Sequence, residues 1–203
     1  PLVGEDLEVS EVRSPQPQRR RDSSMHVSNT NALEKHFRDR LRNEGESPAV
    51  RILGIDPGLA RVGYGVIDTT GGQQTMLDCG MIRTDPGQTE GERMVEIARD
   101  LRQLIRLWRP ELAAVEKFFF YRSSNTIAVV QARGVVIMTL TRFGLPVVEF
   151  PPMQIKQALT GHGHADKDEV LEAVMRELSL ETPPRPDDAA DALAVALTGW
   201  FQR

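Results

Sequence analysis

After residue 49 the chain alternates short apolar runs with longer amphipathic segments, and this order most constrains the fold. Three short runs follow one another closely, over residues 50–55, 63–68 and 76–82, and the turn signal Gly71-Gly72 separates the last two. Short apolar runs bounded by turn residues are typical of strands, and short turns between strands favour hairpins. We therefore expect the folded region to open with an antiparallel meander.

Helical and extended patterns alternate in the rest of the chain. Residues 90–108 carry apolar side chains at the three- and four-residue spacing of one buried helix face. Further helices are expected at about residues 125–142, 153–159, 167–178 and 188–200, and further strands at 112–116 and 146–150. A meander followed by alternating helices and strands predicts an α/β fold, with a five-stranded mixed sheet and helices on both faces.

The first part of the chain has a different composition. Residues 13–24 are polar, contain proline and show no periodicity. Such a segment buries too little apolar surface to offset the entropy lost on ordering. We expect a disordered extension over residues 1–48, or a true start at Met25, before a single folded domain over residues 49–203.

Composition excludes several classes of protein. The single cysteine, Cys79, allows neither a disulfide framework nor a cysteine-rich zinc site, which favours a reduced, cytoplasmic protein in which Cys79 packs as a small apolar residue. No run of 18 apolar residues is present, so no membrane span is expected. The net charge of −4 argues against a nucleic-acid partner, unless the acids are gathered to hold cations.

Two acids stand where strands are expected to end. Asp56 follows the first apolar run and precedes Pro57-Gly58, a setting in which aspartate more commonly just forms the turn. Glu116 closes the apolar run of residues 112–115. A buried carboxylate requires a partner, which would be either a metal ion or an arginine.

Two further acids are three residues apart at the start of the last expected helix. Asp188 and Asp191 would share one helix face, and a divalent cation between them would relieve their repulsion. Alternatively, Asp187 or Asp188 would only cap the helix. Oxygen ligands without cysteine or paired histidines favour Mg²⁺ or Mn²⁺, and two such ions about 4 Å apart can drive phosphodiester hydrolysis.

Four motifs together resemble the RuvC family of Holliday junction resolvases. They are the stretch from Ile52 to Gly65, Val115-Glu116 with the residues after it, Gln131 to Gly134, and Pro186 to Ala194. The resemblance covers about residues 50–200, with the motifs in order, and the expected element order is also that of the RNase H-like fold. It implies a structure-specific DNA endonuclease of recombination and repair.

The resemblance implies that Asp56, Glu116, Asp188 and Asp191 form a catalytic tetrad that holds two Mg²⁺ ions, with Mn²⁺ able to substitute. Some family members carry histidine where Asp188 stands, and the additional Asp187 leaves open which aspartate faces the metals. It further implies a homodimer that makes paired symmetrical nicks in a four-way junction, leaving 5′-phosphate and 3′-hydroxyl ends. The implied partners are the RuvA and RuvB branch-migration proteins.

Several side chains are candidates for contact with DNA. By the resemblance, Lys156 and Lys167 match basic positions linked to catalysis and DNA binding, and Lys167 could stabilise transition-state charge. Phe119 and Tyr121 follow Glu116 and could stack on an unpaired base, although aromatic residues there are more often core. Phosphate contacts are also expected at the start of the next helix, from Arg122, Ser123 and Asn125. Arg133 and Gly134 would lie in the dimer interface, unless Arg133 is a simple surface charge.

Three other interpretations are open at this point. A monomeric nuclease of the same superfamily could act on RNA. An actin-like or sugar-kinase ATPase also has aspartate and glycine after its first strand, but it needs a second phosphate loop and an adenosine-binding Gly-Gly motif that the sequence does not show. A junction-binding module without catalysis would have no reason to place repulsive acids against phosphates.

Overall fold

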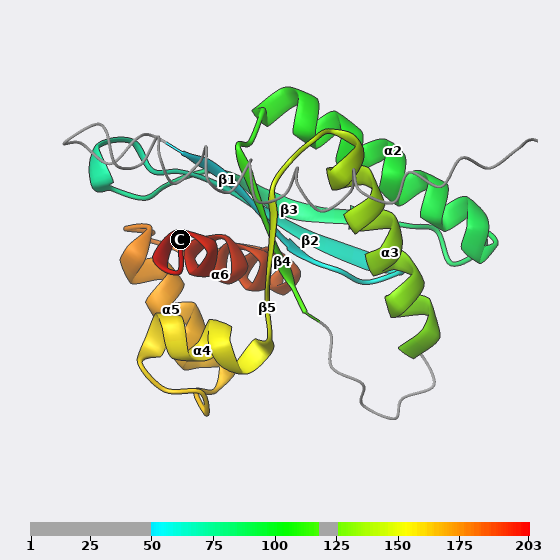
Figure 1. The fold of residues 1–203 in the computed structure, drawn as a ribbon. Helices are drawn as coiled ribbons and strands as arrows, with labels where there is room; N and C mark the ends of the chain where they lie inside the picture. The colour runs from blue at the N-terminus through cyan, green and yellow to red at the C-terminus, as the bar shows by residue number, and fades with distance from the viewer. Residues whose placement is uncertain (1–49, 118–125) are drawn as a thin grey trace, which may run out of the picture.

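Five strands form one mixed sheet in the order β3-β2-β1-β4-β5 in the computed structural model, which describes residues 50–117 and 126–203 (Figure 1). The first three strands form the expected antiparallel meander, and β4 and β5 continue the sheet in parallel with β1. The strands are β1 (Arg51–Asp56), β2 (Arg61–Asp68), β3 (Thr75–Arg83), β4 (Leu112–Glu116) and β5 (Val147–Phe150). The predicted five-stranded mixed sheet is therefore confirmed.

Helices cover both faces of this sheet, as predicted (Figure 1). On one face lie α2 (Glu90–Trp108) and α3 (Thr126–Arg142). On the other lie α4 (Pro152–Thr160), α5 (Lys167–Glu177) and α6 (Asp187–Phe201). The turn between β2 and β3 is a short 3-10 segment, η1 (Thr70–Gly72), in which Gly71 and Gly72 have positive φ angles.

The alternation of side chains along β1 builds two separate cores. Ile52 belongs to the core under α4, α5 and α6, whereas Leu53 and Ile55 belong to the core under α2 and α3. Successive residues of a strand face opposite sides of the sheet. Asp56 has the same parity as Ile52, so its carboxylate lies on the face that carries α6.

Helix α6 lies against the sheet more closely than ordinary side chains would allow. A β-carbon at Gly54 would lie 2.1 Å from the Ala192 carbonyl oxygen, and one at Gly63 would lie 2.1 Å from the Asp188 carbonyl oxygen. Half of the buried residues of α6 are alanines, and another is Gly199. Small residues on both surfaces let the two backbones approach, and this brings the first turn of α6 to the end of β1.

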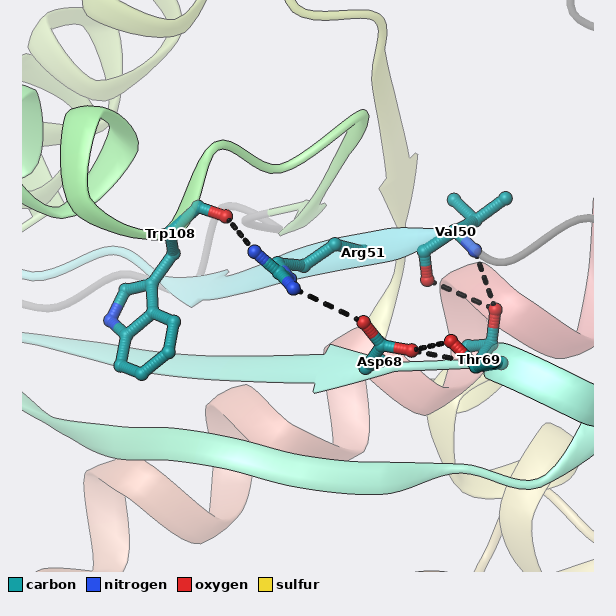
Figure 2. Close-up of polar contacts among 6 residues, drawn as sticks. Val50, Arg51, Asp68, Thr69 and Trp108 are labelled. Atoms are coloured by element: carbon teal, nitrogen blue, oxygen red, sulfur yellow. Dashed lines mark hydrogen bonds and ion pairs between the residues drawn. The ribbon is translucent and has the colours of Figure 1, made fainter.

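Polar contacts fix the opposite end of β1 (Figure 2). The Arg51 guanidinium donates a hydrogen bond to the Trp108 carbonyl at 2.6 Å and pairs with Asp68 at 3.3 Å. The buried Thr69 hydroxyl accepts from the Val50 amide and donates to the Val50 carbonyl. The start of β1 is thereby tied to the end of β2 and the end of α2, away from Asp56.

The structure refines the sequence expectations in a few places. Helix α6 begins at Asp187 without any side-chain capping bond, so the prediction that Asp187 or Asp188 caps it is wrong. Cys79 is half-buried and packs against the core, as expected of a small apolar residue. None of the helices in the described part of the chain has the length and apolar character needed to cross a membrane. The expected extension over residues 1–48 lies outside the described residues.

Candidate active site

Asp56 and Glu116 leave neighbouring parallel strands at the same edge of the sheet. Ile55 pairs with Val115 in the β1–β4 register, so the two acids that follow occupy adjacent positions. Equivalent positions on paired strands face the same side of the sheet. The two carboxylates therefore share the face on which α6 lies.

Asp188 and Asp191 reach this edge from the first turns of α6. Gly63 pairs with Asp56 across β1 and β2, and the backbone of Asp188 lies directly over Gly63. The close packing of α6 thus places its acids beside the end of β1. Three segments that are far apart in the sequence therefore meet at this edge of the sheet.

A pocket of about 350 Å³ opens between these segments. Asp56, Glu116 and Asp191 line it together with Lys156 from α4 and Lys167 from α5. Apolar side chains, among them Ile155 and Val170, complete its walls. The pocket therefore combines three acids with two cations, in surroundings that are partly shielded from water.

Two acids of the pocket, Asp56 and Glu116, have raised pKa values, mainly because they are buried. Burial raises the pKa of Asp56 to about 6, with further contributions from Asp191 and Asp188 that Lys167 partly offsets. Burial also raises the pKa of Glu116 to about 7, with contributions from Asp56 and Asp191. A carboxylate with a raised pKa lacks sufficient positive charge nearby, and a bound cation would supply it.

Lys167 and Arg61 pair with acids of α6 that stand near the pocket. The Lys167 ammonium lies 3.3 Å from Asp191 and 3.8 Å from Asp187, which are one helical turn apart. Burial acts to lower the pKa of Lys167, but these carboxylates and Asp188 outweigh it and raise the pKa. Arg61, at the start of β2, lies 3.5 Å from Asp188. Lys167 is therefore held in its charged form at the mouth of the pocket.

The chemistry of the donors suits a hard divalent cation. The pocket offers carboxylate oxygens and no thiolate, which favours Mg²⁺ or Mn²⁺ over Zn²⁺. Among residues 50–117 and 126–203, however, no three acid, histidine or cysteine side chains are close enough together to form a metal site as they stand. The acids share one pocket, and binding an ion would require their oxygens to draw together.

The raised pKa values carry a consequence for stability without metal. A carboxyl group with a higher pKa in the folded state holds its proton between about pH 4 and 7, where the unfolded chain has released it. The free energy of unfolding therefore falls as pH rises through this window. Below pH 4 both states are protonated, and the difference disappears.

We expect Glu116→Gln to stabilise the metal-free protein at pH 8 by about 2 kcal/mol, because the amide cannot ionise. Urea denaturation in the presence of a chelator measures this gain. Glu111→Gln, which alters an exposed acid just before the same strand, is the matched control and should change little. A gain from Glu116→Gln that is equally large at pH 4 would contradict the explanation.

The candidate residues other than the acids differ in where they lie. Lys156 lines the pocket, as described. Arg133 pairs with Glu149 on β5 and is therefore not a free surface charge. The remaining candidates for DNA contact lie outside the described residues; they are Phe119, Tyr121, Arg122, Ser123 and Asn125.

Sequence reasoning did not single out Arg61 as a residue of the site. The sequence did offer an indication, because Arg61 stands only five residues after Asp56 within the first motif. A charged residue at the start of a strand is usually just solvated, and only the position of Asp188 over Gly63 gives Arg61 an acidic partner.

Comparisons with known proteins show which family the chain resembles. The family described as "Crossover junction endodeoxyribonuclease RuvC" matches residues 52–199. A relative of that name from Synechococcus sp. strain WH7803 is 92% identical over 154 residues, which are 76% of this chain and 100% of the relative. The structure of Thermus thermophilus RuvC is 40% identical with a TM-score of 0.70, covering 74% of this chain and 93% of that one.

A second solved structure, T. thermophilus RuvC in complex with a Holliday junction substrate, is 40% identical with a TM-score of 0.72. It covers 75% of this chain and 94% of that one. The matched region contains both strand ends and the start of α6, where the four acids stand. The chain therefore belongs to the RuvC family of crossover junction endodeoxyribonucleases.

Proposed function

We propose that this protein resolves Holliday junctions by paired symmetrical nicks, as a divalent-metal-dependent endonuclease of DNA recombination and repair. The observation that carries the proposal is the meeting of Asp56, Glu116 and Asp191 in one pocket where burial and mutual repulsion raise two pKa values. Family membership supports the DNA substrate, and the junction complex of the T. thermophilus relative supports the four-way geometry.

Asp56, Glu116, Asp188 and Asp191 would hold the metal. Two Mg²⁺ or Mn²⁺ ions bound there would supply an activated water and stabilisation for the leaving oxygen, giving 5′-phosphate and 3′-hydroxyl ends. Ile155 and Val170 line the pocket beside the acids, and apolar surroundings would strengthen the attraction between the acids and any cation.

Lys156 and Lys167 would hold the phosphate of the strand that is cut. Both line the acid pocket, and each comes from a different helix. Phosphate oxygens are most often bound by Lys and Arg side chains, which position a backbone without reading its sequence. Lys167 is charged and stands next to Asp191, so it is the better placed of the two to stabilise negative charge that develops during cleavage.

The proposed enzyme works as a homodimer. Helix α3 exposes apolar side chains at Ile127, Val130 and Met138, of which Ile127 and Met138 are 73% and 60% exposed. These positions and the open Gly134 lie on one helix face, since they are three, four and four residues apart. An exposed apolar stripe on an otherwise packed helix is typical of a subunit interface. A second copy also supplies the second active site that paired nicks require.

We expect Met138→Asp to convert the dimer into monomers, because a charge would be buried within this apolar stripe. Sedimentation velocity at micromolar concentration measures the change. Val95→Asp, at an equally exposed apolar residue of α2, should leave the dimer intact. Dimers of unchanged affinity in Met138→Asp would place the interface elsewhere.

The RuvA and RuvB branch-migration proteins are included among the proposed partners on the family resemblance alone. A pull-down of the purified chain with each of them, with and without junction DNA, tests this association directly.

The test of the function itself uses a synthetic immobile four-way junction, a linear duplex of the same sequence, and Mg²⁺. We expect the junction to be nicked at two symmetrical positions on strands of like polarity, and the nicked products to be sealed by ligase. Equal cleavage of the linear duplex would overturn junction resolution while leaving a nuclease. Preference for RNA over the DNA junction would favour a different nuclease of the same superfamily.

A further inference from the structure

Lys167 and Asp191 separate two neighbouring cavities. On one side lies the pocket with Asp56 and Glu116, which Lys167 and Asp191 both line. On the other side lies a smaller cavity of about 170 Å³, which the same two residues line together with Arg185 and Asp187. The Lys167 ammonium therefore stands at the boundary between the proposed metal pocket and a second charged cavity.

Asp187 offers Lys167 a carboxylate on this second side. Its side chain is 62% exposed and lies 3.8 Å from the Lys167 ammonium, against 3.3 Å for Asp191. Arg185 holds the other oxygen of Asp187 at 3.0 Å. Asp187 lines only the second cavity of these two, whereas Asp191 lines both. A single ammonium is thus shared between a carboxylate of the metal pocket and one outside it.

We propose that Asp187 is a positioning residue, which takes over Lys167 when a divalent cation binds Asp191. The inference rests on the proposed function, because it concerns ion binding to the same pocket. In this proposal Asp187, the additional aspartate of the Pro186–Ala194 motif, pairs with Lys167 and does not bind the metals. Arg185 fixes Asp187 in the orientation that leaves one oxygen free for the ammonium.

The physical reason is competition for one carboxylate. A divalent ion at Asp191 repels an ammonium that remains at hydrogen-bond distance from the same group. Because Asp187 is one helical turn away, Lys167 can transfer its pairing by a small movement and stay near the pocket. Without Asp187 the ion would have to displace Lys167 into solvent, so ion binding would be weaker and Lys167 would be lost from the site.

The test is a double-mutant cycle on the full-length chain, with Mg²⁺ binding measured by isothermal titration calorimetry at 150 mM salt. The four proteins are wild type, Asp187→Asn, Lys167→Met and the double variant. We expect Asp187→Asn to weaken Mg²⁺ binding about three- to fivefold when Lys167 is present, and by less than about twofold in the Lys167→Met background. At this salt concentration, direct repulsion or attraction over longer distances is largely screened.

Two variants separate this role from general charge effects. Asp187→Glu keeps the carboxylate and should bind Mg²⁺ within about twofold of wild type. Asp168→Asn removes an exposed acid that lines the same second cavity, and it should have little effect. Thermal unfolding of each metal-free variant reports any loss of folding.

The cycle distinguishes failure of the Lys167 transfer from failure of the proposed metal pocket. Equal weakening by Asp187→Asn in both backgrounds would overturn the transfer of Lys167 and leave the metal pocket standing. Stronger Mg²⁺ binding by Asp187→Asn would also overturn it. If wild type bound no Mg²⁺ at all, the proposed function would fail first, and this inference with it.

Discussion

Replacing Asp56 with asparagine is expected to lower the rate of junction cleavage by at least about 10³-fold, which corresponds to about 4 kcal/mol of lost transition-state stabilisation. Asp56 stands where β1, β4 and α6 meet. It pairs with Gly63, over which the backbone of Asp188 lies, and Glu116 ends the neighbouring strand β4. Asparagine has almost the same shape but carries no charge. The fold should therefore persist while the pocket loses its attraction for divalent ions.

Junction binding should survive the same substitution. Removing a negative charge near bound phosphates cannot weaken their attraction to Lys156 and Lys167. Gel-shift titration without metal measures affinity, and single-turnover cleavage with Mg²⁺ measures the rate. Asp100→Asn, at an acid of α2 that pairs with its neighbour Arg99, is the matched control and should retain full activity.

The two measurements together distinguish an enzyme from a binding module. Loss of cleavage with intact binding is expected only if Asp56 takes part in the chemistry. Cleavage by Asp56→Asn within tenfold of wild type would remove this acid from the catalytic group. Loss of both activities would instead point to a fold that depends on Asp56.

Much of the fold could be predicted because local signals and the tertiary structure agree. The capping box of Thr89 and Glu92 begins α2, and the helix ends at Trp108 before Pro110, at the limits its apolar spacing predicted. The apolar run of residues 112–115 became β4 because both faces of a central strand are buried. Such elements are determined by which of their residues are buried, and the apolar pattern of the sequence shows this directly.

The meeting of the acids was partly predictable. Asp56 and Glu116 follow buried strands, and parallel neighbours place their ends at one edge. The ion-pair partners of the acids of α6 depend on long-range packing, which no local sequence pattern contains. Lys167 was predicted to be near the site, but its sharing between Asp187 and Asp191 follows from how α5 lies against α6. The pairing of Arg61 with Asp188 depends in the same way on how α6 lies over β2.

The close contact of α6 with the sheet gives the second large effect. We expect Gly54→Ala to destabilise the protein by about 3 kcal/mol, the upper part of the usual range for overpacking, because its β-carbon would meet backbone and not a flexible side chain. The Ala192 carbonyl oxygen would be 2.1 Å away, and the Ala196 amide nitrogen 2.6 Å. Neither atom can move without shifting the helix.

Such a shift should also impair catalysis in molecules that remain folded. Asp191 directly precedes Ala192, so a helix that moves away from Gly54 carries this acid away from Asp56 and Glu116. A displacement of about 1 Å can cost about 100-fold in rate.

Urea denaturation and cleavage at a temperature where the variant is folded measure the two effects of Gly54→Ala separately. Gly91→Ala, on the exposed first turn of α2 where a β-carbon meets nothing within 4 Å, should instead be neutral or stabilising. If Gly54→Ala cleaved junctions at the wild-type rate, the acids of α6 would not depend on this contact. Their position would then have to be fixed by Lys167 and Arg61, which are the only ion-pair partners of Asp188 and Asp191 in the part of the chain that the structure describes.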